Sequence, residues 1–352
     1  MGIYFANIFV IGIYSLIYNS WKRHLRKECT LRKVMFSFAV LQMFLLLALR
    51  DFSVGVDVIG YVTNRFIDVN VLDFKNALAY NQEWGYTILN RLIWLFSQDR
   101  RIFLIIISAI CMLPVGAFVY EHSKMPFLSL ILYITFNFYS FIFSGLRQGI
   151  AYAITFISLR YIKERKFIKF LLLVLFATTF HKTALVFLPA YFIYHVQYRK
   201  RLFLPVTVLS GLLFLFRAEI ILFIVENFYE GYDVVYSSSY TWMALGALIL
   251  VFGSFFYKET VKASPDSNGL YMMLLTGVIL MLFASAATNA MRIATYYFRF
   301  LILFIPEIIQ AQKNKRVVVV GSYILVMLSL VLYYLMLARN MYGIVPYRFF
   351  WQ

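Results

Sequence analysis

Charged residues are scarce in this chain. Only 14% of its 352 residues are charged, whereas 62% are hydrophobic and 20% are aromatic. Soluble domains carry about 25% charged residues, so the composition excludes an ordinary soluble domain. Apolar segments recur along the whole length, which predicts a single integral membrane domain over 1–352. Polar and apolar residues do not alternate in runs of about ten residues, which argues against an outer-membrane barrel.

Cysteine and histidine are also rare. The two cysteines, Cys29 and Cys111, lie in a basic loop and in an apolar run, so no disulfide is expected. No Cys and His residues have the spacing of a zinc site. The sequence motifs of phosphate-binding loops, serine hydrolases and zinc proteases are absent as well. We therefore expect neither a metal nor another cofactor.

The few charges have a strong sign bias. The formal net charge is +17, which in a soluble chain would suggest a nucleic-acid partner. Here most Lys and Arg residues cluster in short loops, as in the cytoplasmic loops of helical membrane proteins. No nucleic-acid partner is therefore expected, and all of the clusters are assigned to the inside. They lie at 22–33, 163–169, 199–201, 258–262 and 313–316.

Placing every basic cluster on one side determines the topology. The apolar stretch 85–97 has about 13 residues, short of the ~20 that a span needs. Counting it as a crossing would invert every later loop, so we interpret it as an interfacial helix at the outer surface, with Trp84 and Trp94 at headgroup level. The sequence then predicts an all-α polytopic membrane protein with about twelve spans and both termini outside. The spans are near 1–21, 34–49, 102–120, 127–143, 147–162, 167–180, 183–196, 202–217, 241–257, 269–287, 293–311 and 317–338.

Two predicted external loops are long, 50–101 and 218–240, whereas the internal loops are too short for a catalytic domain. Any chemistry is therefore expected at the outer face or within the membrane. The cations assigned to the outer face are almost all arginines. A guanidinium holds phosphate oxygens through two parallel hydrogen bonds, so this bias indicates a phosphorylated or acidic ligand. The alternative for any single arginine is a contact with lipid headgroups or a loop carboxylate.

The segment 144–189 contains the strongest candidate site. Arg147 and His181 flank a basic turn at 163–166, and at about 1.5 Å per residue each lies roughly 22–24 Å from that turn. The two residues would therefore share a depth at the outer face. Of the four histidines only His181 is assigned to the outside, and the like charge of Lys182 favours a neutral imidazole that can accept a proton. The simpler alternative is a structural histidine at a helix end.

Three other arginines need explanation. Arg292 and Arg299 are two helical turns apart, so about 10 Å separates them along one face of a span. Arg299 lies within an apolar run and needs a carboxylate or a ligand as its partner. Arg50 and Asp51 end the second predicted span, where a local ion pair and a ligand role are both open.

Several blocks of the sequence resemble those of EpsG-like proteins, a branch of the Wzy-type polysaccharide polymerases. The stretch 50–61 is similar to the R-D-x-x-x-G-x-D-x-x-x-Y block of that family. Thr183 stands where the family usually has serine. Further similar blocks are E-W-G-Y at 83–86, R-Q-x-x-A at 147–151, F-H-x-T-A at 180–184, and the stretches 291–298 and 344–350. The resemblance covers nearly the whole chain.

The resemblance implies a polymerase that joins undecaprenyl-pyrophosphate-linked oligosaccharide repeat units into O-antigen, capsule or exopolysaccharide. The reaction would take place at the outer leaflet of a bacterial cytoplasmic membrane. We expect His181 to be the base and Arg147 to stabilise the departing pyrophosphate, in a single, metal-independent displacement that inverts the anomeric carbon. The residues expected to bind substrate are Arg50, Asp51, Asp57, Tyr61, Glu83, Gln148, Lys182, Arg292 and Arg299. Whether a chain-length regulator protein binds is left open.

Three alternatives remain at this point. A glycosyltransferase with a polyprenyl-phosphate monosugar donor would use Asp51 or Asp57 as its base, together with a metal. A membrane acyltransferase would use His181 but would need a route for a cytosolic acyl donor. A flippase for lipid-linked oligosaccharides would place charges along a central cavity, whereas here His and Arg gather at one face.

Overall fold

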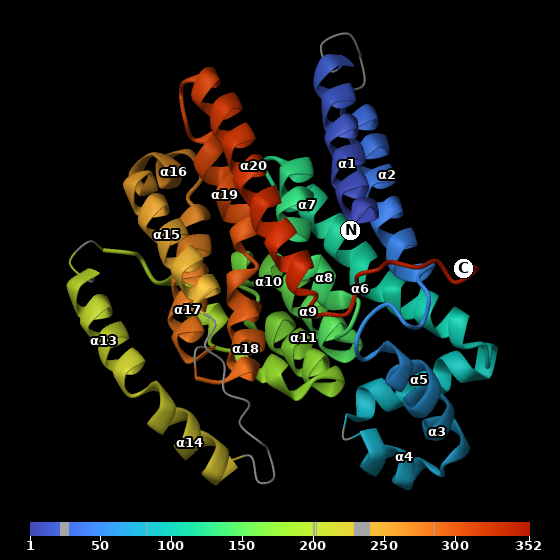
Figure 1. Ribbon diagram of the computed structural model, residues 1–352. Coiled ribbons are helices and arrows are strands. Elements are labelled where there is room, and N and C mark those ends of the chain that lie inside the picture. The colour runs from blue at the N-terminus through green and yellow to red at the C-terminus, as the bar shows by residue number, and fades with distance from the viewer. Residues whose placement is uncertain (22–27, 82, 200, 202, 229–239, 285) are drawn as a thin grey trace. The chain divides into compact units, whose positions relative to one another are not determined.

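The computed structural model is helical almost throughout the residues it describes (Figure 1). Six helical segments are long and apolar enough to cross a membrane, and two bent helix pairs raise this number to at most eight. The prediction of an all-α membrane protein is therefore confirmed. The described residues are 1–21, 28–81, 83–199, 201, 203–228, 240–284 and 286–352. The six segments are Gly2–Trp21, Thr30–Ala48, Arg100–His122, Ser267–Ala284, Ala290–Gln310 and Lys315–Arg339.

Several observed helices are shorter than the predicted spans, because the helix breaks within an apolar run. The predicted span 127–143 is divided into α7 (Pro126–Thr135) and α8 (Phe138–Ile142), because Asn137 between them has a left-handed backbone (φ 64°). Pieces this short fall below the ~20 residues of a span, so the total of about twelve stays a prediction. Other short segments are α9 (Leu146–Ile157), α10 (Leu159–Lys163), α11 (Phe167–Phe180), η2 (Lys182–Phe187) and α12 (Ala190–His195).

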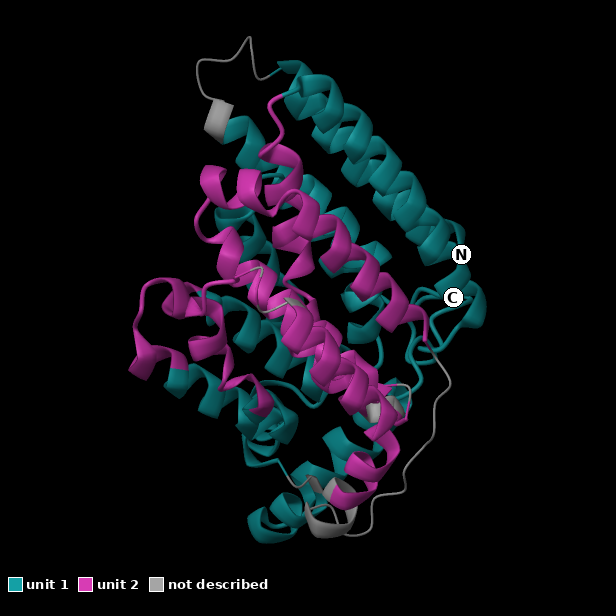
Figure 2. Cartoon of the chain, turned by 90° about the vertical axis from the view of Figure 1, so that its left-hand side faces the viewer, with its two compact units in different colours: residues 1–159, 171–185, 314–352 teal, residues 160–170, 186–313 magenta. Residues whose placement is uncertain are grey.

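The described residues form two compact units, which Figure 2 colours separately. In unit 2, α17 (Ser267–Ala284) packs against α12, α15 (Thr241–Phe255) and α18 (Thr288–Phe298). The organisation as one domain stays a prediction. Unit 1 comprises Met1–Leu159, Leu171–Leu185 and Asn314–Gln352, and unit 2 comprises Arg160–Phe170 and Val186–Lys313. Unit 2 also contains α13 (Phe203–Leu215), α14 (Arg217–Phe228), α16 (Tyr257–Ala263), α19 (Leu301–Gln310) and most of α10.

Unit 1 is a helix bundle in which α6 (Arg100–His122) packs against α2 (Glu28–Ala48) and α9. Helix α1 (Gly2–Trp21) packs on α2 and α7, and α20 (Lys315–Arg339) packs on α7. The faces of α1, α2 and α20 that point away from these contacts are also apolar. Helices that are apolar all round are suited to lipid. Exposed examples on these three helices are Phe9, Leu16, Phe38, Leu41, Met327 and Leu328.

The predicted external loop 50–101 is folded into short helices. The predicted interfacial helix is present as α5 (Trp84–Phe96), whose buried side includes Tyr86 and Ile93 and whose exposed side includes Leu92 and Phe96. Its place at the outer membrane surface stays a prediction. Before it come a π-helical turn η1 (Gly60–Arg65), α3 (Phe66–Val71) and α4 (Phe74–Asn81). In the second predicted loop, α14 extends to Phe228 and residues 229–239 lie outside the described residues.

The C-terminal tail fastens one end of unit 1. The hydroxyl of Tyr4 and the backbone N–H groups of Asp51 and Gly55 donate hydrogen bonds to carbonyls of residues 343–348, at 2.6, 2.9 and 3.0 Å. Gly55 has a φ of 114°, and a Cβ there would lie 2.2 Å from the Phe143 carbonyl oxygen, so only glycine fits. Chain segments that the sequence assigns to the outer face therefore lie together at this end.

Arg50 is fully buried at this end and binds backbone. Its guanidinium donates hydrogen bonds to the carbonyls of Leu47, Val54 and Phe143, and it also lies over the Phe143 ring at 5.1 Å. The predicted alternative of a local ion pair is not what forms, because the Asp51 carboxylate accepts from its neighbour Ser53 instead. Arg50 thus joins the end of α2 to the residues after α8, and its contact with substrate stays a prediction.

We expect Arg50→Met to destabilise the protein strongly. The substitution leaves three buried carbonyls without their donor, at a cost of about 1–3 kcal/mol each. The midpoint of thermal unfolding in detergent should fall well below that of the control Arg100→Met, since Arg100 is exposed. Equal midpoints for the two variants would show that these contacts do not stabilise the fold.

Candidate functional site

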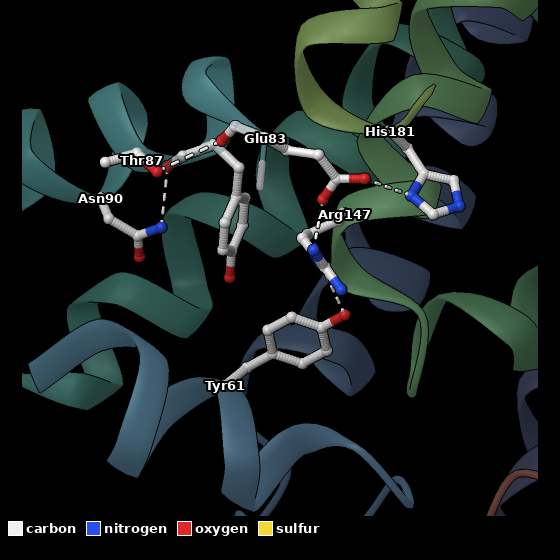
Figure 3. Close-up of polar contacts among 7 residues, drawn as sticks. Tyr61, Glu83, Thr87, Asn90, Arg147 and His181 are labelled. Carbon is white, nitrogen blue, oxygen red and sulfur yellow. Dashed lines mark hydrogen bonds and ion pairs between the residues drawn. The ribbon is translucent and has the colours of Figure 1, made fainter. Parts of the chain in front are cut away.

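A polar cluster lies beside the start of α5, entirely within unit 1 (Figure 3). The Glu83 carboxylate lies between two partners: its Oε1 is 2.8 Å from Nδ1 of His181, and its Oε2 forms an ion pair with Nη1 of Arg147. Nε of Arg147 donates a hydrogen bond to the Tyr61 hydroxyl at 3.1 Å. The segments of Arg147 and His181 therefore meet at one carboxylate, and Tyr61 joins the cluster through Arg147.

Each side chain of the cluster comes from the end of a helix. Glu83 precedes α5 with an extended backbone, and its side chain makes no capping bond to its own helix. The carboxylate therefore stays free for other partners while it lies at the positive end of the helix dipole. Arg147 is in the first turn of α9. His181 follows α11 and still donates its backbone N–H to Ala177 at 3.1 Å.

A close helix contact brings Glu83 and His181 together. A Cβ at Gly85 would lie 2.0 Å from Oγ1 of Thr179, so α5 and α11 touch with no room for a side chain at this position. Gly85 is two positions after Glu83, and Thr179 is two positions before His181. The absence of a Cβ at residue 85 therefore allows the carboxylate to reach the imidazole.

The cluster is largely shielded from solvent, since the side chains of Glu83, Arg147 and His181 are 6%, 18% and 22% exposed. Burial by itself raises the pKa of Glu83, but the hydrogen bond from His181 and the positive charge of Arg147 outweigh it and hold the pKa below the ordinary 4.5. The backbone N–H of Lys182 contributes a further hydrogen bond. Glu83 is therefore a carboxylate at neutral pH.

The charge of Glu83 determines the tautomer of His181. A carboxylate only accepts hydrogen bonds, so Nδ1 of the imidazole must carry the hydrogen. In the neutral ring Nε2 then has the free lone pair, and Figure 3 shows this nitrogen pointing away from Glu83. An imidazole held in this way can remove a proton from a hydroxyl. The neighbouring guanidinium can stabilise negative charge that develops beside it.

The other predicted site residues of unit 1 lie apart from the carboxylate or contact it only through backbone. Gln148 is buried and donates to the Tyr152 hydroxyl at 3.0 Å. The side chains of Asp57 and Lys182 are exposed. The structure thus brings together Tyr61, Glu83, Arg147 and His181 out of the residues predicted in this unit.

Arg292 and Arg299 belong to unit 2. Arg292 is exposed on α18, whereas Arg299 is buried just after the helix ends. Nε of Arg299 donates to the Thr295 carbonyl at 3.1 Å, and its guanidinium lies over the Tyr296 ring at 5.3 Å. The structure thus exposes one arginine of this pair and buries the other, and their common face stays a prediction. Their roles in substrate binding stay predictions.

The sequence analysis did not predict the close contact between Gly85 and Thr179 that joins α5 to α11. A glycine inside a helix costs about 1 kcal/mol relative to alanine, which is a signal that its position has a packing reason. The partner of such a glycine is not visible in one sequence. Among the described residues, no three His, Cys, Asp or Glu side chains are grouped where they could hold a metal ion, and metal independence stays a prediction.

Membrane-spanning helices and a buried carboxylate–guanidinium–imidazole cluster define a polytopic membrane protein with a polar site at one end of a helix bundle. The model of the EpsG family matches residues 33–349. The chain therefore belongs to the EpsG family, as its sequence blocks predicted. The family is associated with membrane polysaccharide polymerases of the glycosyltransferase kind. No curated protein and no solved structure matches the chain.

We expect Gly85→Ala to destabilise the protein, because the added Cβ forces α5 away from Thr179. Overpacking of this kind costs about 1–3 kcal/mol. Gly321→Ala is the matched control, since Gly321 lies in α20 with open space around it and alanine favours the helix. Thermal unfolding in detergent should separate the two variants. A midpoint for Gly85→Ala at or above that of Gly321→Ala would refute the close contact.

We expect the stabilisation by Glu83 to depend on pH. Its folded-state pKa is below 4.5, so its contribution is complete above that value and is lost as the pH falls through the folded-state pKa. The difference in unfolding midpoint between wild type and Glu83→Gln should be large above pH 4.5 and should shrink as the pH falls below that value. Glu259→Gln, at an exposed glutamate, is the control. A difference that stays constant over this range would contradict the ion pair.

Proposed function

We propose that this protein polymerises lipid-linked oligosaccharide repeat units at the outer face of a bacterial cytoplasmic membrane. The observation that supports this proposal is the cluster in which one carboxylate contacts both His181 and Arg147. The substrates would be undecaprenyl-pyrophosphate-linked oligosaccharides, whose polyprenyl tails remain among the membrane lipids. Family membership supports the reaction class, and the geometry supports the assignment of roles.

In the proposed reaction, the hydroxyl oxygen of the acceptor glycan attacks the anomeric carbon of the donor glycan. A new glycosidic C–O bond forms while the bond from that carbon to the pyrophosphate oxygen breaks. The bonding electron pair leaves with undecaprenyl pyrophosphate, and the hydroxyl proton passes to Nε2 of His181, which later releases it to water. A single displacement of this kind inverts the anomeric carbon.

Arg147 is suited to the leaving group. Its guanidinium is only 18% exposed, so its charge is weakly screened by water. A fixed cation acts most strongly where negative charge develops in the transition state. In this reaction that is the pyrophosphate oxygen that leaves the anomeric carbon. Its planar fork can hold two phosphate oxygens at once. Lys182, exposed beside His181, would supply a second cation at the mouth of the site.

We expect His181→Ala and Arg147→Lys each to abolish long polysaccharide chains. Loss of a general base lowers rates about 10²–10⁴-fold, and lysine retains the charge of Arg147 but lacks its fork. The measurement is repeat-length analysis of surface glycan in a strain that depends on this protein, at matched protein level. Arg100→Lys, at an exposed arginine, is the control. Long chains in either site variant would contradict the roles assigned.

These strains, together with one that carries Asp57→Asn, distinguish the alternative functions. Single-repeat lipid that accumulates at the outer leaflet indicates a missing polymerase, whereas accumulation at the inner leaflet indicates a missing flippase. Loss of product in Asp57→Asn together with normal product in His181→Ala would favour a transferase that uses a polyprenyl-phosphate sugar.

A further inference from the structure

The two oxygens of the Glu83 carboxylate are divided between partners of different kinds. Oε1 binds the imidazole of His181, and Oε2 binds the guanidinium of Arg147. The carboxylate is 6% exposed, so little solvent competes for either contact. In this state its negative charge is largely balanced by Arg147. The imidazole therefore donates a hydrogen bond to Glu83, but most of the negative charge of this carboxylate is offset by Arg147.

Arg147 has no free fork in this state. Its Nη1 is paired with Glu83, and its Nε donates to the Tyr61 hydroxyl. Two parallel hydrogen bonds to phosphate require two neighbouring N–H groups, so a pyrophosphate must displace at least one of these partners. A pyrophosphate diester carries two negative charges, and a single carboxylate carries one. The contact between Arg147 and Glu83 is the one that a dianion can exchange.

We propose that Glu83 is an exchangeable counter-ion that couples donor binding to the basicity of His181, which deepens the proposed function and rests on it. When the donor pyrophosphate takes the Arg147 guanidinium, the charge of Glu83 acts on His181 alone. The imidazole then holds the acceptor proton more strongly, as an ion pair with Glu83. Glu83 is a positioning residue in this scheme, and the donor binds before the acceptor is deprotonated.

The surroundings of His181 support this coupling. The charged groups nearest to it are Glu83 at the start of α5, Arg147 on α9 and Lys182 on its own segment. The phenols of Tyr61 and Tyr86 interact with Arg147 and carry no charge at neutral pH. Glu83 is thus the one anion in this set. When Arg147 is taken away from it, the negative charge that Glu83 exerts on His181 is no longer balanced.

The test is titration of the His181 imidazole in the full-length protein by NMR, in detergent, with and without inorganic pyrophosphate. The His181→Gln variant assigns its signal among the four histidines. In wild type, pyrophosphate should raise the titration midpoint by about one pH unit, a tenfold gain in proton affinity. In Glu83→Gln, which retains an oxygen acceptor for Nδ1–H, this rise should fall to less than half although pyrophosphate still binds, because only the charge of the ligand then acts on the imidazole. Glu83→Asp retains the charge and should recover part of the rise.

Asp73→Asn is the control, because it removes an exposed carboxylate from the same region of unit 1 and should leave the rise intact. A wild-type midpoint that does not move with pyrophosphate overturns the coupling, and so does failure of wild type to bind pyrophosphate. A purely structural Glu83 would lower the unfolding midpoint of Glu83→Gln but leave the rise unchanged. If His181→Ala and Arg147→Lys abolish long chains while pyrophosphate does not shift the titration, the coupling is wrong and the proposed function stands.

Discussion

One buried carboxylate shared between a guanidinium and an imidazole is the interaction on which the site depends. A buried charge without a partner costs several kcal/mol, so Glu83 needs a cationic partner, which is Arg147 in this structure, and its hydrogen bonds to remain ionised. This requirement connects the start of α5 with the start of α9 and the end of α11. It also determines which nitrogen of His181 is available for chemistry, because an ionised carboxylate cannot donate a hydrogen bond.

Two arginines of unit 1, Arg50 and Arg147, bind partners of different kinds. Arg50 donates to neutral backbone carbonyls, and any ligand that took its guanidinium would leave those carbonyls buried and unpaired. Arg147 is paired with an anion, and a phosphate can replace that anion without leaving an unpaired charge on the arginine. The partner of an arginine, more than its burial, therefore indicates which of the two is suited to a substrate.

The sequence predicted the fold class and the proximity of Arg147 and His181, because the helical rise on either side of the basic turn determines their depth. It placed Glu83 among the substrate-binding residues but could not show its two partners. Residues 50–101 look like a loop in the sequence, since helices as short as α3 carry little periodic signal. The contact between Gly85 and Thr179 joins residues far apart in the chain. The span count was least predictable, because a break such as that at Asn137 lies inside an uninterrupted apolar run.

The distribution of buried charge in unit 1 fits the proposed polymerase better than the alternative of a flippase. The buried charged side chains that the structure describes in this unit are Arg50 and Glu83. Both contact the chain at 143–147, since Arg50 donates to the Phe143 carbonyl and Glu83 pairs with Arg147. A carrier that moves a pyrophosphate across the bilayer needs polar partners at successive depths, because an unpaired charge there is costly. Within the described part of unit 1, the buried charges instead gather in one region, which agrees with the reaction proposed above.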